Sequence, residues 1–438
     1  MAGLDSTLVQ LVGHETPSPL KTSPPRRPLL GPPRNNFLFL QGVSSPFFIE
    51  LAKGLRTIGQ QVHSISFNVG DVLYGAGSRL SCRSPSDDLD DYYAQIFRDL
   101  DITDIVLFGD CRPVHRPAVS LARLRGINIH VFEEGYFRPY WVTLEREGVN
   151  SNSRLPRDPR WYMDVGKHIP RYQNGNPFKL SFAARAAHDV LYHAGGALNA
   201  LCYPKYRTHA PFSAAAEYAG FIRQSTRLLR SLSRDNKLVA EVAEERRPTF
   251  LLPLQLDSDA QIRDHSPFSN MSHVIEHVID SFSLNAPFDA RLLVKNHPLT
   301  PGLVNYRHIT NALAEKYGVA DRVEFMESGY MPTLLSHITG MITVNSTAGA
   351  SALFHKRPTI ALADPIYAMP GLTHQGSLAD FWHRPEMPDM TLFRRFRNTV
   401  IHTTQVNGGF YTSSGIDMAV TNCLEVLMAK TSRIEKYL

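Results

Sequence analysis

Short apolar runs alternate with amphipathic segments through two long stretches of the chain, separated by a stretch with a different pattern. The strand-like runs are residues 36–40, 62–67, 104–109 and 127–132 in the first stretch, and 249–256, 290–295, 323–325, 340–344 and 358–362 in the second. Helix-like segments with a period near 3.6 lie between them, as at 47–58 and 306–317. This repeated strand–helix–strand order predicts parallel sheets covered by helices.

The regions outside these stretches set the expected domain boundaries. A proline-rich tail, 1–34, has few large apolar residues to bury and is expected to be disordered. We predict an α/β fold of the GT-B kind, with two Rossmann-like domains (35–160 and 248–400) facing a central cleft. A mostly helical insertion rich in aromatic and basic residues, 161–247, connects them, and a C-terminal segment, 401–438, could return to the N-terminal domain.

Composition narrows the class of protein. The 438 residues are 43% hydrophobic and 20% charged, which is ordinary for a globular protein. Mean hydropathy is −0.20 and no run approaches the roughly 18 apolar residues of a membrane span. The start lacks the pattern of a signal peptide, so a cytoplasmic protein is expected. Its four cysteines lie far apart, so neither a disulfide scaffold nor a cysteine-based zinc site is expected. A net charge of +5 does not indicate a nucleic-acid binder.

Ligands of open parallel sheets bind beyond the carboxyl ends of the strands, so residues that follow strands are the first candidates for a site. Glu133 and Glu134 follow the strand-like run at 127–132, and Arg138 comes soon after. Two adjacent carboxylates at the end of a buried strand are costly unless they are solvated, paired or functional. They indicate either a solvated turn or a carboxylate that faces the cleft as an acid or base.

The loop after the run at 249–256 carries a second group of candidates. Gln255, Asp257, Asp259 and Arg263 lie within nine positions of one another. The Asp257–Asp259 spacing resembles a metal-binding DxD motif, but two acids in such a loop are commonly helix caps. A nucleophilic or electrostatic carboxylate is therefore favoured here over a metal ligand, and we expect no metal.

Two further strand ends have groups suited to an anion. Lys295 and His297 follow one strand, and Asn345, Ser346 and Thr347 follow another and open a helix. Backbone N–H groups and hydroxyls at a helix N-terminus attract phosphate, and a cation nearby adds to the attraction. Surface polarity and an ordinary N-cap are the alternatives. Because both segments occur together, we favour a phosphate site.

A basic stripe lies in the helical insertion. Arg223, Arg227, Arg230 and Arg234 recur at helical spacing, so they share one face. Like charges on one face repel, and an anionic partner would relieve that repulsion. The stripe indicates either a solvated face or contact with an anionic membrane surface, where each basic residue contributes about 1 kcal/mol.

Several of these segments together resemble one family. The segments that carry the resemblance are residues 108–113, 133–139, 148–150, 155–159, 259–263, 295–298, 345–349 and 371–376. They are similar, in one order, to the KpsS/LipB family of capsule polysaccharide proteins, over about residues 36 to 407. The match is closer to the Kdo transferase that starts the capsule's lipid anchor than to the larger two-module KpsC relative.

The resemblance implies a retaining β-Kdo transferase that uses CMP-β-Kdo and a phosphatidylglycerol-type acceptor, usually lyso-phosphatidylglycerol. It would work at the inner face of the cytoplasmic membrane, on an anionic surface and beside other capsule assembly proteins, with no metal or other cofactor and no nucleic acid. Asp259 is then the expected nucleophile and Asp257 a structural residue. Glu133 is the expected base, with Glu134 less favoured. Gln255, Arg138 and Arg263 would hold sugar groups in a cleft between an acceptor domain and a nucleotide-sugar domain.

Two other functions fit parts of the pattern. A nonenzymatic capsule assembly or export factor would hold lipid-linked glycan without needing acids in the cleft. A sugar-nucleotide epimerase on a GT-B-like fold would need no lipid, and the basic stripe weighs mildly against it.

Overall fold

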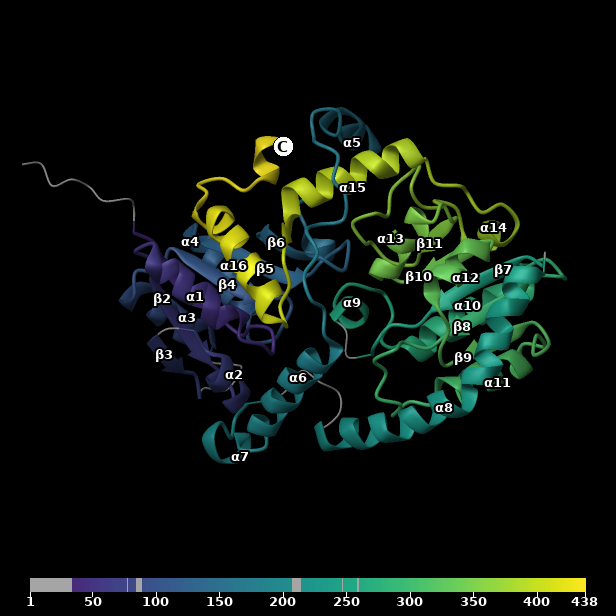
Figure 1. The fold of residues 1–438 in the computed structure, drawn as a ribbon, viewed down its shortest axis with the longest axis horizontal. Helices are drawn as coiled ribbons and strands as arrows, with labels where there is room; N and C mark the ends of the chain where they lie inside the picture. The colour runs from purple at the N-terminus through teal and green to yellow at the C-terminus, as the bar shows by residue number, and fades with distance from the viewer. Residues whose placement is uncertain (1–33, 77, 84–88, 207–213, 246, 258–259) are drawn as a thin grey trace, which may run out of the picture. The chain divides into compact units, whose positions relative to one another are not determined.

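The computed structural model of this chain describes residues 34–76, 78–83, 89–206, 214–245, 247–257 and 260–438. Residues 35–438 form one compact unit, which contains two separate β-sheets (Figure 1). The proline-rich tail expected to be disordered falls almost wholly outside the described residues, and so does Asp259.

The first sheet has seven strands in the order β12-β6-β5-β4-β1-β2-β3. They are β1 (Asn36–Phe39), β2 (Gln61–Ser66), β3 (Ser78–Ser81), β4 (Asp104–Phe108), β5 (Asn128–Glu134), β6 (Trp141–Arg146) and β12 (Gln405–Asn407). The five strands from β5 to β3 are parallel, whereas β6 runs antiparallel to both of its neighbours. The expected parallel core is therefore present, with a mixed edge added to it.

Both faces of the first sheet are buried, because alternate side chains of a strand point to opposite faces. Its helices are α1 (Phe47–Thr57), α2 (Val69–Tyr74), α3 (Leu89–Asp99), α4 (Arg116–Arg125) and α16 (Ser413–Met428). In β4, Ile105 and Leu107 join a cluster with residues of α3 and α4, whereas Val106 joins a cluster with residues of α1 and α16. The continuous apolar run at 104–109 thus reflects a strand covered on both sides.

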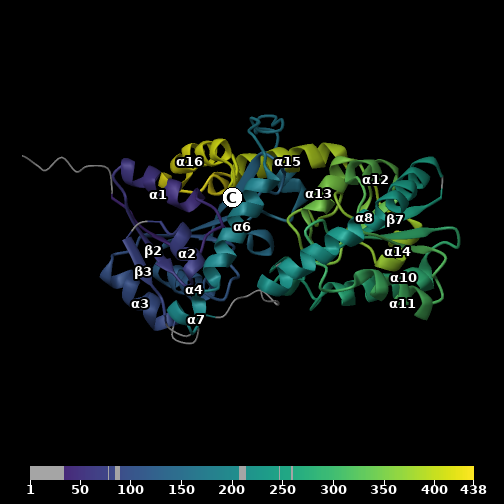
Figure 2. The same ribbon diagram turned by 60° about the horizontal axis from the view of Figure 1, so that its bottom comes forward.

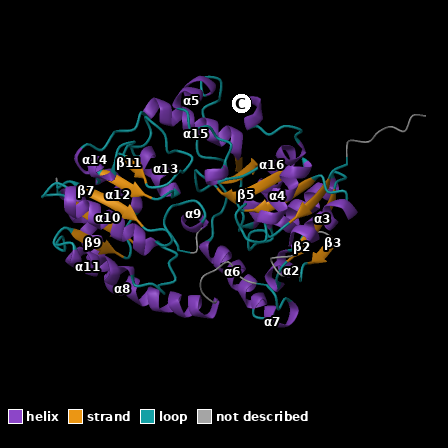
Figure 3. Ribbon diagram, turned by 180° about the vertical axis from the view of Figure 1, so that it is seen from behind, coloured by secondary structure: helices purple, strands orange, loops and turns teal. Residues whose placement is uncertain are grey.

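The second sheet is wholly parallel, with five strands in the order β11-β10-β7-β8-β9. They are β7 (Thr249–Pro253), β8 (Arg291–Lys295), β9 (Val323–Met326), β10 (Gly340–Thr343) and β11 (Thr359–Ala361). The short helices around its strand ends are α9 (Ala260–Arg263), α12 (Met331–His337), α13 (Thr347–Phe354) and α14 (Leu378–His383). Two longer helices, α10 (Met271–Asn285) and α11 (Tyr306–Lys316), complete the layer pattern (Figure 3).

The second sheet is also covered on both faces. Phe250 and Leu252 of β7 pack in one cluster with α10 and with Trp382 of α14, whereas Leu251 packs in another cluster with α8 and α12. Two helix-covered sheets of mainly parallel strands confirm the α/β, GT-B-like fold class expected from the sequence.

The segment between the two sheets divides its helices between them. The helices are η2 (Asn150–Asn152), α5 (Pro159–Val165), α6 (Phe182–Gly196), α7 (Asn199–Cys202) and α8 (Ala214–Glu244). Helix α6 packs against α2 of the first sheet's layer, and α8 packs against α12 of the second (Figures 1 and 2). In the part of the chain that the structure describes, no helix is long and apolar enough to cross a membrane.

The last part of the chain returns to the first sheet. Helix α15 (Met390–Thr404) leaves the second sheet's layer and packs against α5. Strand β12 then pairs with β6, α16 packs against α1, and η3 (Ile434–Lys436) ends the described elements. This return places Phe396 of α15 in one cluster with Tyr136, Tyr162 and Tyr367, which come from both sheets' layers.

The structure corrects one boundary that matters for the site. The sequence pattern ends the strand at residue 132, with both glutamates in the loop that follows, whereas β5 continues to Glu134. The reason is β6, which the sequence pattern did not reveal: Glu133 pairs with Thr143 and Glu134 with Val142. This antiparallel pairing extends β5 by two residues, so both glutamates lie on a strand rather than on a turn.

Candidate functional site

A pocket lies where residues that follow strands of the two sheets meet. Its lining residues from the first sheet's side are Glu133, Glu134, Tyr136, Phe137, Arg138 and Asn150. Those from the second sheet's side and from α15 are Gln255, Leu256, His297, Asn345, Ser346, Thr347, Ala350, Pro365, Ile366, Tyr367 and Phe396. Eight candidates that the sequence scatters over more than 200 positions therefore lie around one pocket.

The two adjacent glutamates of β5 both line the pocket but are held differently. Glu134 accepts a hydrogen bond from the Tyr411 hydroxyl at 3.0 Å and lies 3.5 Å from the guanidinium of Arg185. Glu133 accepts a hydrogen bond from the backbone N–H of Glu134 at 2.9 Å through Oε1. The neighbouring phenol and guanidinium therefore hold the Glu134 carboxylate in place beside Glu133.

A third acid, Glu145 on β6, is buried and contacts Tyr136 of the pocket. It accepts hydrogen bonds from the hydroxyls of Tyr136, at 2.7 Å, and Ser153, at 2.5 Å. Burial raises the pKa of Glu145 to about 7, although both hydrogen bonds and the charge of Arg157 oppose that shift. The Glu145 carboxyl group thus holds Tyr136, which lines the pocket, in position. Near neutral pH, Glu145 is protonated in a large fraction of the molecules.

His297 supplies a neutral imidazole from the end of β8. Burial, together with the smaller effect of the nearby cations Lys295, Arg138 and Arg185, lowers its pKa to about 4. Its Nδ1 accepts the backbone N–H of Leu299 at 3.1 Å, so in the neutral ring Nε2 carries the proton. His297 can therefore donate one hydrogen bond to a ligand in the pocket.

Lys295 has a different position from the one expected. It is 4% exposed, its ammonium group lies 3.5 Å from the backbone oxygen of Asn296, and it is not among the residues that line the pocket. Burial lowers the pKa of Lys295, and the charge of Asp235 opposes that shift. Any effect of Lys295 on a bound anion would act through its field rather than through direct contact.

The segment after β10 forms the second sheet's side of the pocket. Gln255 Nε2 donates to Asn345 Oδ1 at 3.0 Å, and the Asn345 backbone N–H donates to Gln255 Oε1 at 3.3 Å. This pairing locks two candidate side chains to each other. Ser346 caps α13 by accepting the Ala348 N–H at 3.1 Å. The cap and an anion site are compatible, because the hydroxyl satisfies only one of the free N–H groups at the helix start.

Sequence reasoning missed the loop that follows β11. Pro365, Ile366 and Tyr367 line the pocket, and the Tyr367 hydroxyl donates to the Ser346 backbone oxygen at 2.5 Å. A Cβ at Gly349 would lie 2.2 Å from that hydroxyl, so only glycine allows this approach. The same strand-end rule, applied to the run at 358–362, would have found this loop.

Of the two aspartates in the segment 255–263, the structure describes only Asp257. Asp257 accepts the Met271 backbone N–H at 2.8 Å and a hydrogen bond from the Tyr306 hydroxyl, contacts that agree with the structural role expected for it. Asp259, the expected nucleophile, lies outside the described residues. Arg263 lies 3.7 Å from Asp264 and does not line the pocket.

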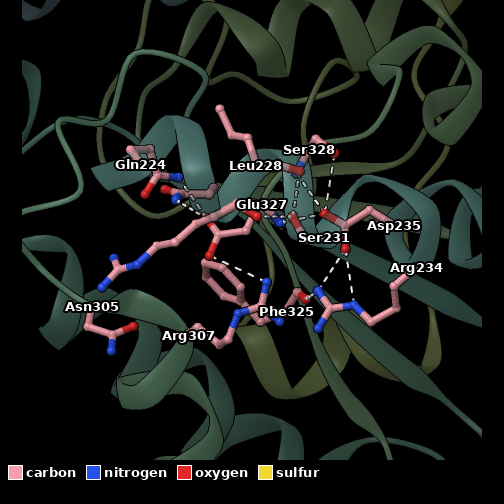
Figure 4. A network of polar contacts seen from close by, with 12 residues as sticks. Gln224, Leu228, Ser231, Arg234, Asp235, Asn305, Arg307, Phe325, Glu327 and Ser328 are labelled. Carbon is pink, nitrogen blue, oxygen red and sulfur yellow. Dashed lines mark hydrogen bonds and ion pairs between the residues drawn. The ribbon is translucent and has the colours of Figure 1, made fainter. Parts of the chain in front are cut away.

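The basic stripe of α8 is partly neutralised within the protein. Arg234 donates to Asp235 at 2.7 Å and to the Phe325 backbone oxygen at 2.9 Å (Figure 4). Arg223 donates to the Gly302 backbone oxygen, and Arg227 lies 3.4 Å from the same oxygen. The four arginines therefore differ in how many contacts within the protein they would have to give up to bind an external anion.

The adjacent, buried face of α8 supports the loop that carries His297. Glu327 Oε2 accepts a hydrogen bond from Gln224 of α8 at 2.9 Å (Figure 4). It accepts another from Asn296 at 2.7 Å. Asn296 Oδ1 in turn accepts the backbone N–H of His297 at 2.9 Å. A buried chain of polar contacts thus runs from α8 to the pocket, which the sequence spacing did not indicate.

This architecture, with two helix-covered sheets and a pocket between their strand ends, defines a GT-B-like protein. Comparison with known proteins identifies its family. Residues 103–411 match the family described as "Capsule polysaccharide biosynthesis protein". The chain belongs to this capsule polysaccharide biosynthesis family, as the resemblance in its motifs indicated.

Two relatives are similar over most of their length. The chain is 35% identical to the capsule polysaccharide export protein KpsS of Escherichia coli, over 86% of this chain and 96% of that protein. It is 33% identical to the capsule polysaccharide modification protein LipB of Neisseria meningitidis serogroup B, over 86% and 91%. Among solved structures, a Thermosulfurimonas dismutans KpsC described as a beta Kdo 2,7 transferase matches with 13% identity and a TM-score of 0.41, over 89% of this chain and 99% of that one.

Proposed function

We propose that this protein is a retaining β-Kdo glycosyltransferase. It moves Kdo from CMP-β-Kdo to a phosphatidylglycerol or lyso-phosphatidylglycerol acceptor and so initiates the poly-Kdo linker of a capsular polysaccharide. The observation that carries the proposal is the pocket itself, which has carboxylates on one side and groups suited to a phosphate on the other. Membership of the capsule polysaccharide biosynthesis family supports the assignment to capsule synthesis.

The second sheet's side of the pocket suits the CMP phosphate. Asn345, Ser346 and Thr347 stand at the N-terminus of α13, whose dipole favours an anion, and His297 adds a neutral N–H donor. CMP is a good leaving group once its phosphate is stabilised, so a helix terminus and hydrogen-bond donors can do what a metal does in other transferases. In this scheme the donor needs no metal or other cofactor.

Retention of configuration requires two inversions, and each has its own carboxylate. In the first step a carboxylate oxygen of Asp259 attacks the anomeric carbon of Kdo, and the bond to CMP breaks with its electron pair on the phosphate oxygen. In the second step the acceptor hydroxyl attacks that carbon, its proton passes to Glu133, and the bond to Asp259 breaks. The role of Asp259 rests on the family resemblance, whereas Glu133 lines the pocket.

The remaining candidates have supporting roles in this proposal. Arg138 and Gln255 line the pocket and could hold the Kdo carboxylate and hydroxyls. Arg263, the last residue of α9, does not line the pocket and would join them only if α9 moves towards it. Arg227 and Arg230 on α8 would contact the anionic inner face of the cytoplasmic membrane, close to other capsule assembly proteins.

Product formation tests the proposal directly. The full chain is incubated with CMP-Kdo, generated in situ because it is labile, and with lyso-phosphatidylglycerol, and mass spectrometry follows the lipid. We expect the lipid to gain one Kdo residue, whereas lyso-phosphatidylethanolamine should gain none. Asp259→Asn should abolish the gain while CMP binding persists, and Asp257→Asn serves as the matched control. No gain with any acceptor would overturn the transferase assignment.

A second candidate function follows from the relative named as an export protein. A nonenzymatic export or assembly factor would hold lipid-linked glycan without using a nucleotide. Calorimetry with CMP separates the two functions, because the transferase binds CMP and the export factor does not.

A further inference from the structure

Three side chains with metal-binding atoms meet next to the pocket. Asp110 and Cys111 directly follow β4 of the first sheet, and His265 follows α9 in the layer of the second. One carboxylate oxygen, the Cys111 sulfur and one imidazole nitrogen all lie within 4.8 Å of one another. Among the residues that the structure describes, this is the one such group of three or more histidine, cysteine or acidic side chains.

We propose that Asp110, Cys111 and His265 form a binding site for a transition-metal ion of the zinc class, which ties the loop after β4 to the loop after α9. The site does not depend on which sugar the protein transfers. It is also separate from the residues proposed to bind the CMP phosphate, since none of the three side chains lines that pocket.

The backbone brings the two first-sheet ligands into place. Gly109 has a φ of +70°, a conformation that favours glycine, and it turns the chain sharply at the end of β4. Asp110 is 5% exposed, and Asn152 donates a hydrogen bond to its Oδ2 at 2.9 Å. This bond orients the carboxylate beside the Cys111 side chain, with which Asp110 also forms a hydrogen bond.

The imidazole of His265 is oriented in the way that metal ligands usually are. Its Nδ1 contacts the Ser151 hydroxyl, and its Nε2 lies 3.3 Å from the Cys111 sulfur. In metal sites the ring nitrogen that does not bind the ion is commonly held by such a second partner. Asn345 of the pocket also donates to the His265 backbone oxygen at 3.0 Å, which fixes the loop.

The donor set selects the kind of ion. Sulfur, nitrogen and oxygen together suit Zn²⁺ and similar ions, whereas Mg²⁺ and Ca²⁺ prefer oxygen alone. In a tetrahedral zinc site with ordinary bond lengths, sulfur and nitrogen lie about 3.5 Å apart, close to the distance found here. A nearby carboxylate, Asp264, accepts a hydrogen bond at 2.5 Å from Arg116, the first residue of α4, and so also connects the two sheets' layers.

The same 3.3 Å distance also fits a thiol–imidazole hydrogen bond without an ion, so the test must detect the metal itself. The full chain, without a histidine tag, is stripped with a chelator and titrated with Co²⁺. We expect one equivalent to bind, with the visible bands of tetrahedral Co²⁺ and a thiolate-to-metal charge-transfer band in the near ultraviolet. Zn²⁺ should displace the Co²⁺ and remove these bands.

Variants distinguish this site from adventitious binding. Cys111→Ser should remove the charge-transfer band and weaken Co²⁺ binding at least about tenfold, because a thiolate ligand is lost. Cys202→Ser, which removes an exposed thiol elsewhere, should match the unchanged protein. Asp110→Asn keeps the thiol and imidazole and should weaken binding without removing the band, which serves as the test if Cys111→Ser does not fold. No tetrahedral bands in the unchanged protein, or equal spectra for Cys111→Ser and Cys202→Ser, would overturn the proposal.

Discussion

The two sheets share one layer pattern but have opposite chemistry where their strands end. At the first sheet, Glu133, Glu134 and Asp110 place carboxylates on or just after strands. At the second, His297 and Ser346 place hydrogen-bond donors and a helix N-terminus at the corresponding edge. The same supersecondary unit therefore provides two different half-sites, and the pocket is where they face each other. Function in this fold depends on the strand-end residues rather than on the sheets.

The largest expected effect tests the acidic side. Glu133→Gln keeps the size of the side chain but removes the proposed base, so transfer of Kdo should fall about 10²–10⁴-fold while CMP affinity stays unchanged. Kinetics and calorimetry on the same preparation measure both. Glu134→Gln is the matched control and should lose less, because Tyr411 and Arg185 already hold Glu134. Equal losses in the two variants would remove the distinction between the glutamates.

The buried acid of the first sheet should make stability depend on pH. Because the folded-state pKa of Glu145 is raised to about 7, folding favours its protonated form. Its contribution to stability is full below the unfolded-state pKa and is lost as pH rises through about 7. Between about pH 5 and 8, this one group lowers the free energy of unfolding by up to about 3 kcal/mol.

Glu145→Gln should flatten that pH dependence, which urea titrations at several pH values measure. Glu147→Gln alters an acid on the neighbouring turn that is 36% exposed, so it should leave the dependence as it is. If the free energy of unfolding of Glu145→Gln changes with pH as steeply as that of the unchanged protein, then another group titrates in this range. Glu145 would then be ionised near neutral pH.

A third prediction concerns the binding of the α8 arginines to an anionic lipid surface. Arg227→Glu with Arg230→Glu should weaken binding to phosphatidylglycerol vesicles by about 30-fold or more, since each basic residue contributes about 1 kcal/mol. Vesicle sedimentation measures it at fixed salt. Arg98→Glu with Arg125→Glu makes the same charge change in helices of the first sheet's layer and should have a small effect. Equal losses would show that net charge matters and that α8 has no special role.

His297→Ala tests the donor side of the pocket. Loss of the Nε2–H donor should weaken CMP binding by about 1–2 kcal/mol, or 5- to 30-fold. His308→Ala, at an exposed position on α11, is the control and should bind CMP normally. Calorimetry gives both affinities, and an unchanged value for His297→Ala would remove this residue from the phosphate site.

The smallest effect concerns the support of that histidine. Asn296→Ala breaks the link from Glu327 to the His297 backbone and should weaken CMP binding about threefold. Adding Asn296→Ala to His297→Ala should then cost little more, because the supported side chain is already absent. Additive losses would mean that Asn296 acts on the pocket independently of His297.

The periodicity of the sequence was sufficient for the layers but not for the edges of the sheets. Continuous apolar runs such as 104–109 predict strands buried on both faces, and β4 is one. Strands β3, β6 and β12 went unpredicted because all three mix apolar with polar residues, and β3 and β12 are short strands at the two edges of the sheet. The pairing of β6 with β12 is set by contacts between residues more than 250 positions apart, such as Val142 with Val406.

The sequence by itself determined the fold class, the family and eight of the seventeen residues that line the pocket, since strand ends can be read from local pattern and the motifs are local. Only the tertiary structure decided which of these side chains reach the pocket. Lys295 and His297 are two positions apart, yet one is buried beside the site and the other lines it. The meeting of Asp110, Cys111 and His265 was also beyond the sequence, because their 4.8 Å proximity arises from two loops that follow different sheets. Spacing along the chain describes neighbours within an element, whereas proximity between elements depends on how whole layers pack.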